Sequence, residues 1–331
     1  MDFISADING IEKEGFIRHS GIDMNIGTEN NFEIKIQNKY FDKERYWYES
    51  QIFAPGTEYG GIIRGINPIT EDGIIKLKGP TWRGMLDQHP IYEDANTYFY
   101  LNGEANSVLS ERIIALGLGD LFVVDTSDSG IYFSNYEVPL QSMLMTAFAD
   151  ALYELNARLD IKYVQGDANG CGYVFLSVKE VVDHSDTIEI SEDGNVKLNI
   201  LDYRGGVNHM ICLGGGELAS RSRVDLYAWP DGTIKKNQYY TGIQRNCMYY
   251  ENSNADTVEE LEEDGRKKFE DVKNYKQLKI SVTDLDLDLG DIVGGRERIT
   301  GITMKSPVVR KILTVTGKGR ETIQYKLKGD E

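Results

Sequence analysis

The sequence predicts a mainly β protein with an α+β insertion, in which two β regions flank a small α/β domain. Runs of alternating apolar and polar residues, typical of half-buried strands, fill roughly the first 90 residues and return from about residue 185. The stretch between them carries apolar residues at helical spacing. We therefore divide the chain into three parts: a first β region (1–92), an inserted α/β domain (93–184), and a second β region (185–331) with one helix near 256–272.

The first region is predicted to consist of strands and tight turns. In NFEIKI (31–36), Phe32, Ile34 and Ile36 alternate with polar residues. Asp72-Gly73 is a hairpin turn signal, because glycine tolerates the positive φ that such a turn needs. Further strands are expected at Tyr46-Trp47-Tyr48, Gln51-Ile52-Phe53 (stopped by Pro55-Gly56), GGIIRGI (60–66) and IIKLKG (74–79).

Three helices are expected. One covers 106–117, and a second begins near Pro139 and repeats apolar residues at helical spacing as far as Leu155. The third covers about 256–272, with Asp256 as a possible cap, although Gly265 weakens the prediction. Strands DIKYV (160–164) and YVFLSV (173–178) complete the α/β region.

The last region returns to strands, with Asp193-Gly194 and Asp231-Gly232 as turn signals. The expected strands are TIEIS (187–191), VKLNI (196–200), VNHMICLG (207–214), RVDLYAW (223–229), LKISV (278–282), DLDLDLGDIV (284–293), RITGITM (298–304), VRKILTVTG (309–317) and TIQYKL (322–327).

Two segments share a pattern that suggests an internal repeat. Each has I-x-G-I, at 63–66 and at 299–302, then a hairpin loop with Pro68 or Pro307, then a strand that ends in glycine. Such short matches also arise by chance between any two hairpins. If the repeat is real, each chain has two similar β domains, and three chains in a ring have six near-equivalent domains. A trimer can then bind a partner that has sixfold symmetry.

The charge balance is strongly acidic, with a formal net charge of −17. Nucleic-acid-binding proteins neutralise phosphates with clustered Lys and Arg, and anionic membranes attract basic segments, so both classes are disfavoured. An acidic surface suits a passage for a polyanion, or simply solubility.

Three widely spaced cysteines, Cys171, Cys212 and Cys247, favour free thiols made in a reducing cytosol. Neither a secretion signal nor a membrane-spanning apolar stretch is expected.

No motif predicts a catalytic, cofactor-binding or metal-binding residue. The run Asp284, Asp286, Asp288 and Asp291 alternates with leucines, which favours a strand with one acidic face over a calcium loop. We hypothesise that this face lines a channel. Gly214-Gly215-Gly216 lacks a phosphate-loop pattern and predicts a tight turn. The four histidines have no zinc spacing, and a pairing of Cys171 with His184 or His209 could arise only through the fold.

Three stretches resemble the tail hub proteins of siphoviruses. They are 60–89, which is similar to the opening barrel of such hubs, 173–234 in the middle, and 287–327, which is similar to the last barrel. They cover less than half of the chain. The middle stretch carries the family's succession of a short Asp/Ser segment, an Asn before an apolar strand, a Gly-Gly-Glu turn and an Arg, here Asp183 to Ser185, Asn208, Gly215-Gly216-Glu217 and Arg221.

The resemblance, which extends to the tube-forming hubs of contractile tails and type VI secretion spikes, implies a non-enzymatic structural protein of a phage or prophage tail. It implies that residues 1–92 and 185–331 form two related tube-type β-barrel domains. It also implies a homotrimeric baseplate hub that adapts a sixfold tail tube to a threefold spike or tip and leaves an axial passage. The implied partners are the tail tube or distal tail protein, the spike or tail tip protein and the tape measure protein, with no cofactor. The protein would be made in the bacterial host cytoplasm and located in the virion tail.

Two alternatives of other classes remain open at the level of sequence. A tail-associated peptidoglycan hydrolase would need a carboxylate pair that only the fold could assemble, which 53 acidic residues permit by chance. A carbohydrate-binding receptor module would need exposed aromatic clusters, for which the pairs Tyr239-Tyr240 and Tyr249-Tyr250 are the best candidates. The tryptophans Trp47, Trp82 and Trp229 are expected in core or interface packing.

Overall fold

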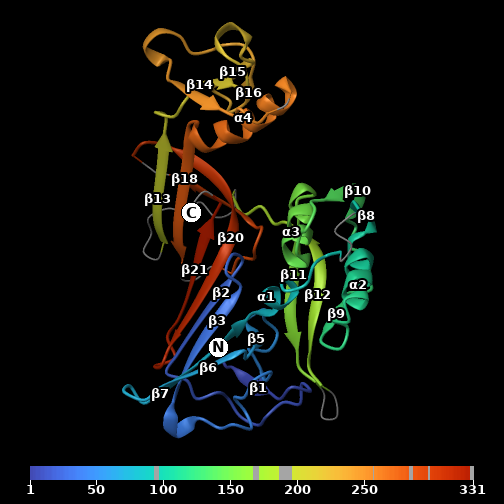
Figure 1. Cartoon of the computed structure of the whole chain (residues 1–331). Coiled ribbons are helices and arrows are strands. Elements are labelled where there is room, and N and C mark those ends of the chain that lie inside the picture. The colour runs from blue at the N-terminus through green and yellow to red at the C-terminus, as the bar shows by residue number, and fades with distance from the viewer. Residues whose placement is uncertain are drawn as a thin grey trace. The chain divides into compact units, whose positions relative to one another are not determined.

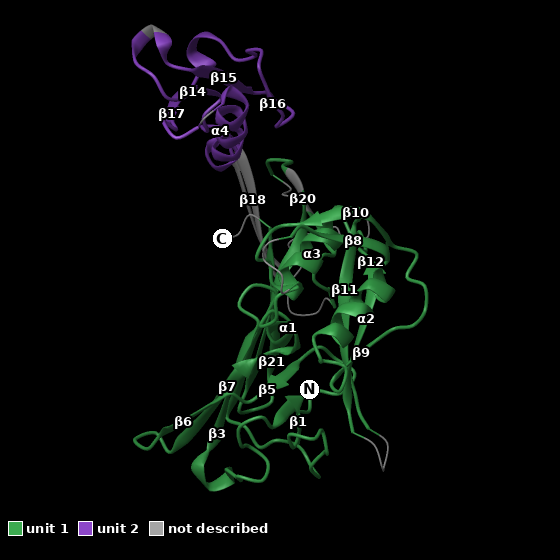
Figure 2. Ribbon diagram, turned by 45° about the vertical axis from the view of Figure 1, so that its right-hand side comes forward, with its two compact units in different colours: residues 1–198, 279–331 green, residues 199–278 purple. Residues whose placement is uncertain are grey.

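Strands dominate the computed structural model, as the sequence predicts. It describes residues 1–92, 97–166, 171–185, 196–255, 257–282, 286–296 and 299–328. Strands hold 39% of the chain and helices 18%, so the predicted mainly β class with an α+β insertion is confirmed. The chain divides into two units, residues 1–198 with 279–331 and residues 199–278 (Figure 2). The division at residues 92 and 184 stays a prediction from sequence pattern.

The largest sheet of the first unit joins strands from both ends of the chain (Figure 1). Its strands follow the order β19 (Ile292–Arg296), β20 (Thr303–Thr316), β2 (Gly21–Ile26), β3 (Asn31–Gln37), β7 (Ile74–Pro80) and β6 (Gly65–Ile69), and β21 (Glu321–Leu327) also pairs with β20. The central pairing is antiparallel, with Met24 opposite Leu313 and Ile22 opposite Val315. These four side chains are buried, because alternation places them all on the core face of the sheet.

The remainder of the first unit forms smaller sheets and three helices. The strands are β1 (Ile4–Ala6), β4 (Gln51–Phe53) and β5 (Gly60–Ile62) in one sheet, β8 (Phe99–Glu104) and β10 (Tyr132–Val138) in a second, and β9 (Phe122–Val124), β11 (Ala157–Val164) and β12 (Tyr173–Glu180) in a third. The helices are α1 (Trp82–Leu86), α2 (Ala105–Ala115) and α3 (Leu144–Glu154), with the 3-10 turn η1 (Asn38–Tyr40). One core joins them, in which the rings of Phe53 and Tyr163 stack with centroids 3.6 Å apart.

The second unit is a sheet covered on one face by a helix. The sheet order is β16 (Ile234–Lys235), β15 (Arg223–Ala228), β14 (His209–Leu213) and β17 (Cys247–Glu251), and α4 (Val258–Val272) is the helix. Met210, Cys212, Leu226, Leu261 and Phe269 share its core. The short 3-10 turns η2 (Leu218–Ser220) and η3 (Gly242–Gln244) lie in its loops, and β13 (Val196–Tyr203) pairs with β18 (Tyr275–Val282) where the chain enters and leaves this unit.

Several local predictions are confirmed. Gly73 has a φ of +64° in the turn between β6 and β7, and Gly232 has a φ of +82° in the turn after β15. Helix α2 (Ala105–Ala115) lies within two residues of the predicted range 106–117, and α4 lies within the predicted range 256–272. Thr257, which was not predicted as a cap, caps α4 by accepting a hydrogen bond from the Glu260 amide. The predicted cap Asp256, the turn Asp193-Gly194, the strand 187–191 and Asp284 lie outside the described residues.

Other local predictions are wrong. Tyr46 to Tyr48 lie in a turn, in which Tyr46 is buried while Trp47 and Tyr48 are exposed. Helix α3 begins at Leu144, because Pro139 lies in the turn that precedes it.

The second copy of the proposed repeat is not a hairpin, which is a further correction. β20 runs without a break from Thr303 to Thr316, with Pro307 inside it opposite Ile292. A β-bulge between Val308 and Arg310 follows at once, and a bulge is one of the places where a strand accepts proline. The expected pair of closed barrels is also absent from the described residues, since the two β regions contribute strands to one open sheet.

Candidate assembly site

Two edges of the large sheet are open. Among the described strands, β6 pairs only with β7, and β19 and β21 each pair only with β20. Ile292 of β19 also bonds to the backbones of Val182 and His184, so we consider β6 and β21. An edge strand presents backbone N–H and C=O groups that can pair with a strand of another chain. We call β6 and β21 the open edges.

The open edges are compatible with each other in direction. Every neighbouring pair on the path β21, β20, β2, β3, β7, β6 is antiparallel, so strand direction alternates along it. Six strands alternate in total, and β6 therefore runs opposite to β21. If copies are related by rotation about an axis along the strands, β6 of one copy meets β21 of the next in the antiparallel sense throughout. A head-to-tail contact of this kind closes into a ring.

The face of the sheet opposite the core carries charged residues. Glu33 on β3 lies 3.0 Å from Lys76 Nζ and 3.1 Å from Lys78 Nζ, both on β7. Partial burial alone would raise the pKa of Glu33, but the hydrogen bonds from these two lysines outweigh it and hold the pKa below its ordinary value. This face is therefore a solvated, ion-paired surface that mixes both signs of charge.

A buried charge cluster ties the sheet to the α/β part of the same unit. Glu58, which follows β4, lies 2.7 Å from Lys311 Nζ of β20 and accepts a hydrogen bond of 3.0 Å from Arg83 of α1. Arg83 also donates to the carbonyl oxygen of Leu159 on β11 at 2.8 Å. Glu58, Arg83 and Lys311 are each less than a tenth exposed. Burial alone would raise the pKa of Glu58, but Lys311 and Arg83 keep it below its ordinary value.

The same cluster continues through the acidic run. Lys311 Nζ lies 3.1 Å from Asp288, and Arg158 of β11 lies 2.7 Å from Asp288 and 3.2 Å from Asp291. Asp291 also accepts a hydrogen bond from the Val182 amide. We refer to Glu58, Arg83, Arg158, Asp288, Asp291 and Lys311 as the charge cluster.

These contacts correct the hypothesis of an acidic strand lining a channel. Residues 286–291 form no strand, and Asp288 and Asp291 are paired with cations inside the unit. Asp286 is exposed.

Sequence reasoning missed the charge cluster, although one signal was present. Lys311 stands two residues before Leu313 and four before Val315, on the core side of an alternating strand. A lysine in such a position needs a buried anion.

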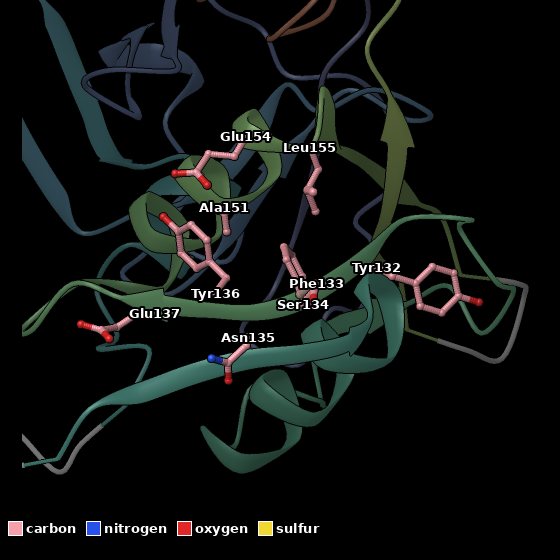
Figure 3. Close-up of a pocket in the computed structure, with 9 residues that line it drawn as sticks. All are labelled: Tyr132, Phe133, Ser134, Asn135, Tyr136, Glu137, Ala151, Glu154 and Leu155. Carbon is pink, nitrogen blue, oxygen red and sulfur yellow. The ribbon is translucent and has the colours of Figure 1, made fainter.

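An open hollow in the first unit has a volume of about 440 Å³. It is lined by β10 from Tyr132 to Glu137 and by the end of α3, and Tyr136 reaches toward Ala151 and Glu154 while Tyr132 points away (Figure 3). Glu137 accepts a hydrogen bond of 2.8 Å from the Tyr100 hydroxyl. The lining offers two glutamates and tyrosine hydroxyls, which suits hydrogen bonding to a polar surface.

The aromatic pairs differ in what they present. Tyr239 contacts both Trp229 and Tyr240, with ring centroids 5.1 Å and 5.0 Å apart, and is half exposed. Tyr249 and Tyr250 alternate along β17 instead, so Tyr249 is exposed and Tyr250 packs against the core of the second unit. Trp82 is fully buried, as predicted, while Trp47 is 44% exposed.

Other residues that were singled out from the sequence lie in the second unit. The tight turn predicted at Gly214 to Gly216 is wrong, because these glycines begin a longer connection (214–222) between β14 and β15 that contains η2. Arg221 donates to the Gly214 carbonyl oxygen within this connection. His209 meets Cys247 rather than Cys171. Among the described residues, no three or more His, Cys, Asp or Glu residues are grouped to hold a metal ion. No helix in the described part of the chain is long and apolar enough to cross a membrane.

Comparison with solved structures shows the fold of phage tail proteins. The MuSo2 prophage 43 kDa tail protein of Shewanella oneidensis superposes with a TM-score of 0.55 at 13% identity, covering 98% of each chain. Prophage tail protein gp18 of Listeria monocytogenes gives 0.52 at 11% identity, covering 100% of this chain and 95% of that one. A tail protein of Neisseria meningitidis gives 0.50 at 12% identity, covering 100% and 97%.

These likenesses confirm the predicted resemblance to phage tail proteins at the level of the fold. No family model matches the sequence, and no curated protein matches it.

Proposed function

We propose that this chain is a structural, non-enzymatic baseplate hub of a phage or phage-like tail. Three copies form a ring that adapts a sixfold tail tube to a threefold spike or tip and leaves an axial passage. The observation that carries the proposal is the alternating sheet, open at β6 and β21, in a chain whose fold matches prophage tail proteins over nearly its whole length. The tail tube or distal tail protein, the spike or tip protein and the tape measure protein are the proposed partners.

The charge cluster supports this proposal because it can hold the subunit rigid under load. A ring subunit has to transmit load between its neighbours, and ion pairs that bridge β20, α1 and β11 fix the sheet to the α/β part of the unit. The polar face of the sheet, which carries Glu33, Lys76 and Lys78, can remain in water when copies join edge to edge.

A proline in β21 tests whether the open edge is used. The backbones of Arg320 and Lys328 hydrogen-bond to β20. Backbone groups of successive residues point to opposite sides of a strand, and Ile323 is an odd number of residues from both, so its N–H points to the open side. Ile323→Pro removes that donor, and a proline is tolerated on the outer side of an edge strand. We expect the variant to fold but to be missing from assembled tails.

The matched control is Ile323→Ala, which loses the side chain but keeps the N–H. It should enter tails at the wild-type level, as measured by quantitative mass spectrometry of purified particles. Wild-type incorporation of the proline variant would show that β21 is not an assembly edge.

One observation favours a second candidate function. The Trp229, Tyr239 and Tyr240 cluster offers adjacent aromatic rings, the kind of surface on which sugar rings stack, and Lys235 Nζ lies 3.9 Å from the Trp229 ring centroid. A carbohydrate-binding role in receptor recognition would use this cluster.

A further inference from the structure

The uncovered face of the second unit brings a thiol, an imidazole and a carboxylate together. β14 and β17 are parallel with His209 opposite Cys247, so the two side chains emerge side by side. Cys247 Sγ lies 3.4 Å from His209 Nδ1, and His209 Nε2 lies 2.7 Å from Asp225 Oδ1 on β15. Sequence distance hides this arrangement, since 38 residues separate Cys247 from His209.

The hydrogen bonds fix the state of the ring. A carboxylate only accepts hydrogen bonds, so His209 Nε2 carries the hydrogen that Asp225 accepts. Nδ1 is then an acceptor, and Arg245 donates to it from Nη2 at 2.8 Å and from Nε at 3.1 Å. Tyr227 stacks on the ring with centroids 4.3 Å apart and holds its plane.

Arg245 and the Cys247 sulfur contact the same nitrogen of His209, so a cation and an imidazole share the surroundings of this thiol. Reactive cysteines lie in electropositive surroundings that solvent can reach. His209 is buried, whereas Cys247 is exposed, so reagents can reach the sulfur. The register also places Asp225, Arg223, Glu251 and Lys235 on this face. Asp225 and Arg223 pair with each other at 2.7 Å.

We propose that Cys247 is a selectively reactive thiol that exchanges with low-molecular-weight disulfides, with Arg245 and His209 as its positioning residues. The Cys247 thiolate attacks one sulfur of the disulfide, the bond between the two sulfurs of the reagent breaks, and the second sulfur leaves as a thiolate. Cys247 is oxidised to a mixed disulfide and the reagent is reduced, while the thiol proton goes to solvent. The site is a point of reversible covalent modification.

The other two cysteines are internal references. Cys171 is exposed, and Cys212 is buried beneath α4. Burial, together with the negative charges of Asp225 and Glu262, raises the pKa of the Cys212 thiol to about 11. Cys212 should therefore stay unmodified while the second unit is folded.

The test treats the full chain with dithiobis(nitrobenzoate), follows the coloured leaving thiolate, and assigns each site by peptide mass spectrometry. We expect Cys247 to react about tenfold faster than Cys171, because Arg245 and His209 surround its sulfur. Arg245→Met should bring the two rates together, and Arg245→Lys should keep them apart.

Arg221→Met is the control, since Arg221 pairs with Glu251 on the same strand as Cys247. It should leave the rate ratio unchanged, and continued protection of Cys212 reports that each variant is folded. Equal rates at Cys247 and Cys171 in the wild-type chain, or a ratio that Arg245→Met does not alter, would overturn the proposal.

Discussion

Lys311 shows how one residue can couple parts of the chain that are distant in sequence. It is 4% exposed, on the core side of β20, and its ammonium contacts Glu58 and Asp288. Burial alone would lower the pKa of Lys311, but Glu58 and the other anions around it raise it instead, so the ammonium stays charged. Glu58 in turn depends on this cation, because a buried carboxylate without a partner is strongly disfavoured.

Lys311→Met should therefore lower the free energy of unfolding by about 3–5 kcal/mol, the usual cost of leaving one partner of a buried ion pair alone. Urea denaturation followed by tryptophan fluorescence measures the change. Lys305→Met on the same strand is the matched control, because Lys305 is 53% exposed and its pair with Asp183 is worth about 1 kcal/mol at most. Equal effects of the two substitutions would contradict the role given to the charge cluster.

Helix α4 shows the same dependence on context at the scale of an element. By propensity, Gly265 weakens the helix, since alanine is favoured there by about 1 kcal/mol. The structure gives the reason for glycine: a Cβ at this position would lie 2.4 Å from Cys212 Sγ. The helix approaches β14 closely because position 265 has no side chain.

Gly265→Ala should destabilise the second unit by about 1–3 kcal/mol, because overpacking at this contact outweighs the gain in helix propensity. The double variant Gly265→Ala, Cys212→Ala should recover most of that loss, since removing the sulfur makes room for the methyl group. Thermal unfolding followed by circular dichroism at the helix band compares the three proteins. A more stable single variant would show that the close approach does not constrain this position.

The elements themselves were largely predictable from sequence, whereas their partners were not. Alternation predicts β3 and β12, and helical spacing predicts α2, because each pattern is local. β20 was expected as two pieces, since Pro307 suggests a loop until the bulge beside it is known. Residues 286–291 alternate like a strand but form none. Asp288 pairs with Arg158 and Lys311 instead, and Asp291 pairs with Arg158.

At the scale of the whole molecule, the pairing of β2 with β20 decides the architecture. Asp23 and Thr314 hydrogen-bond across a separation of 291 residues, and no local pattern encodes such a contact. The expectation that each β region closes into its own barrel was wrong, because β2 and β20 belong to one open sheet. The candidate assembly site could not be predicted from the sequence either, because the open edges are defined only when the strand order is known.

The most direct test of the proposed hub is electron cryomicroscopy of the intact tail particle. We expect three copies of this chain in one ring between the tail tube and the spike or tip, with β6 of each copy beside β21 of the next. A different copy number, a position away from the tail axis, or copies whose β6 and β21 edges do not meet would contradict it.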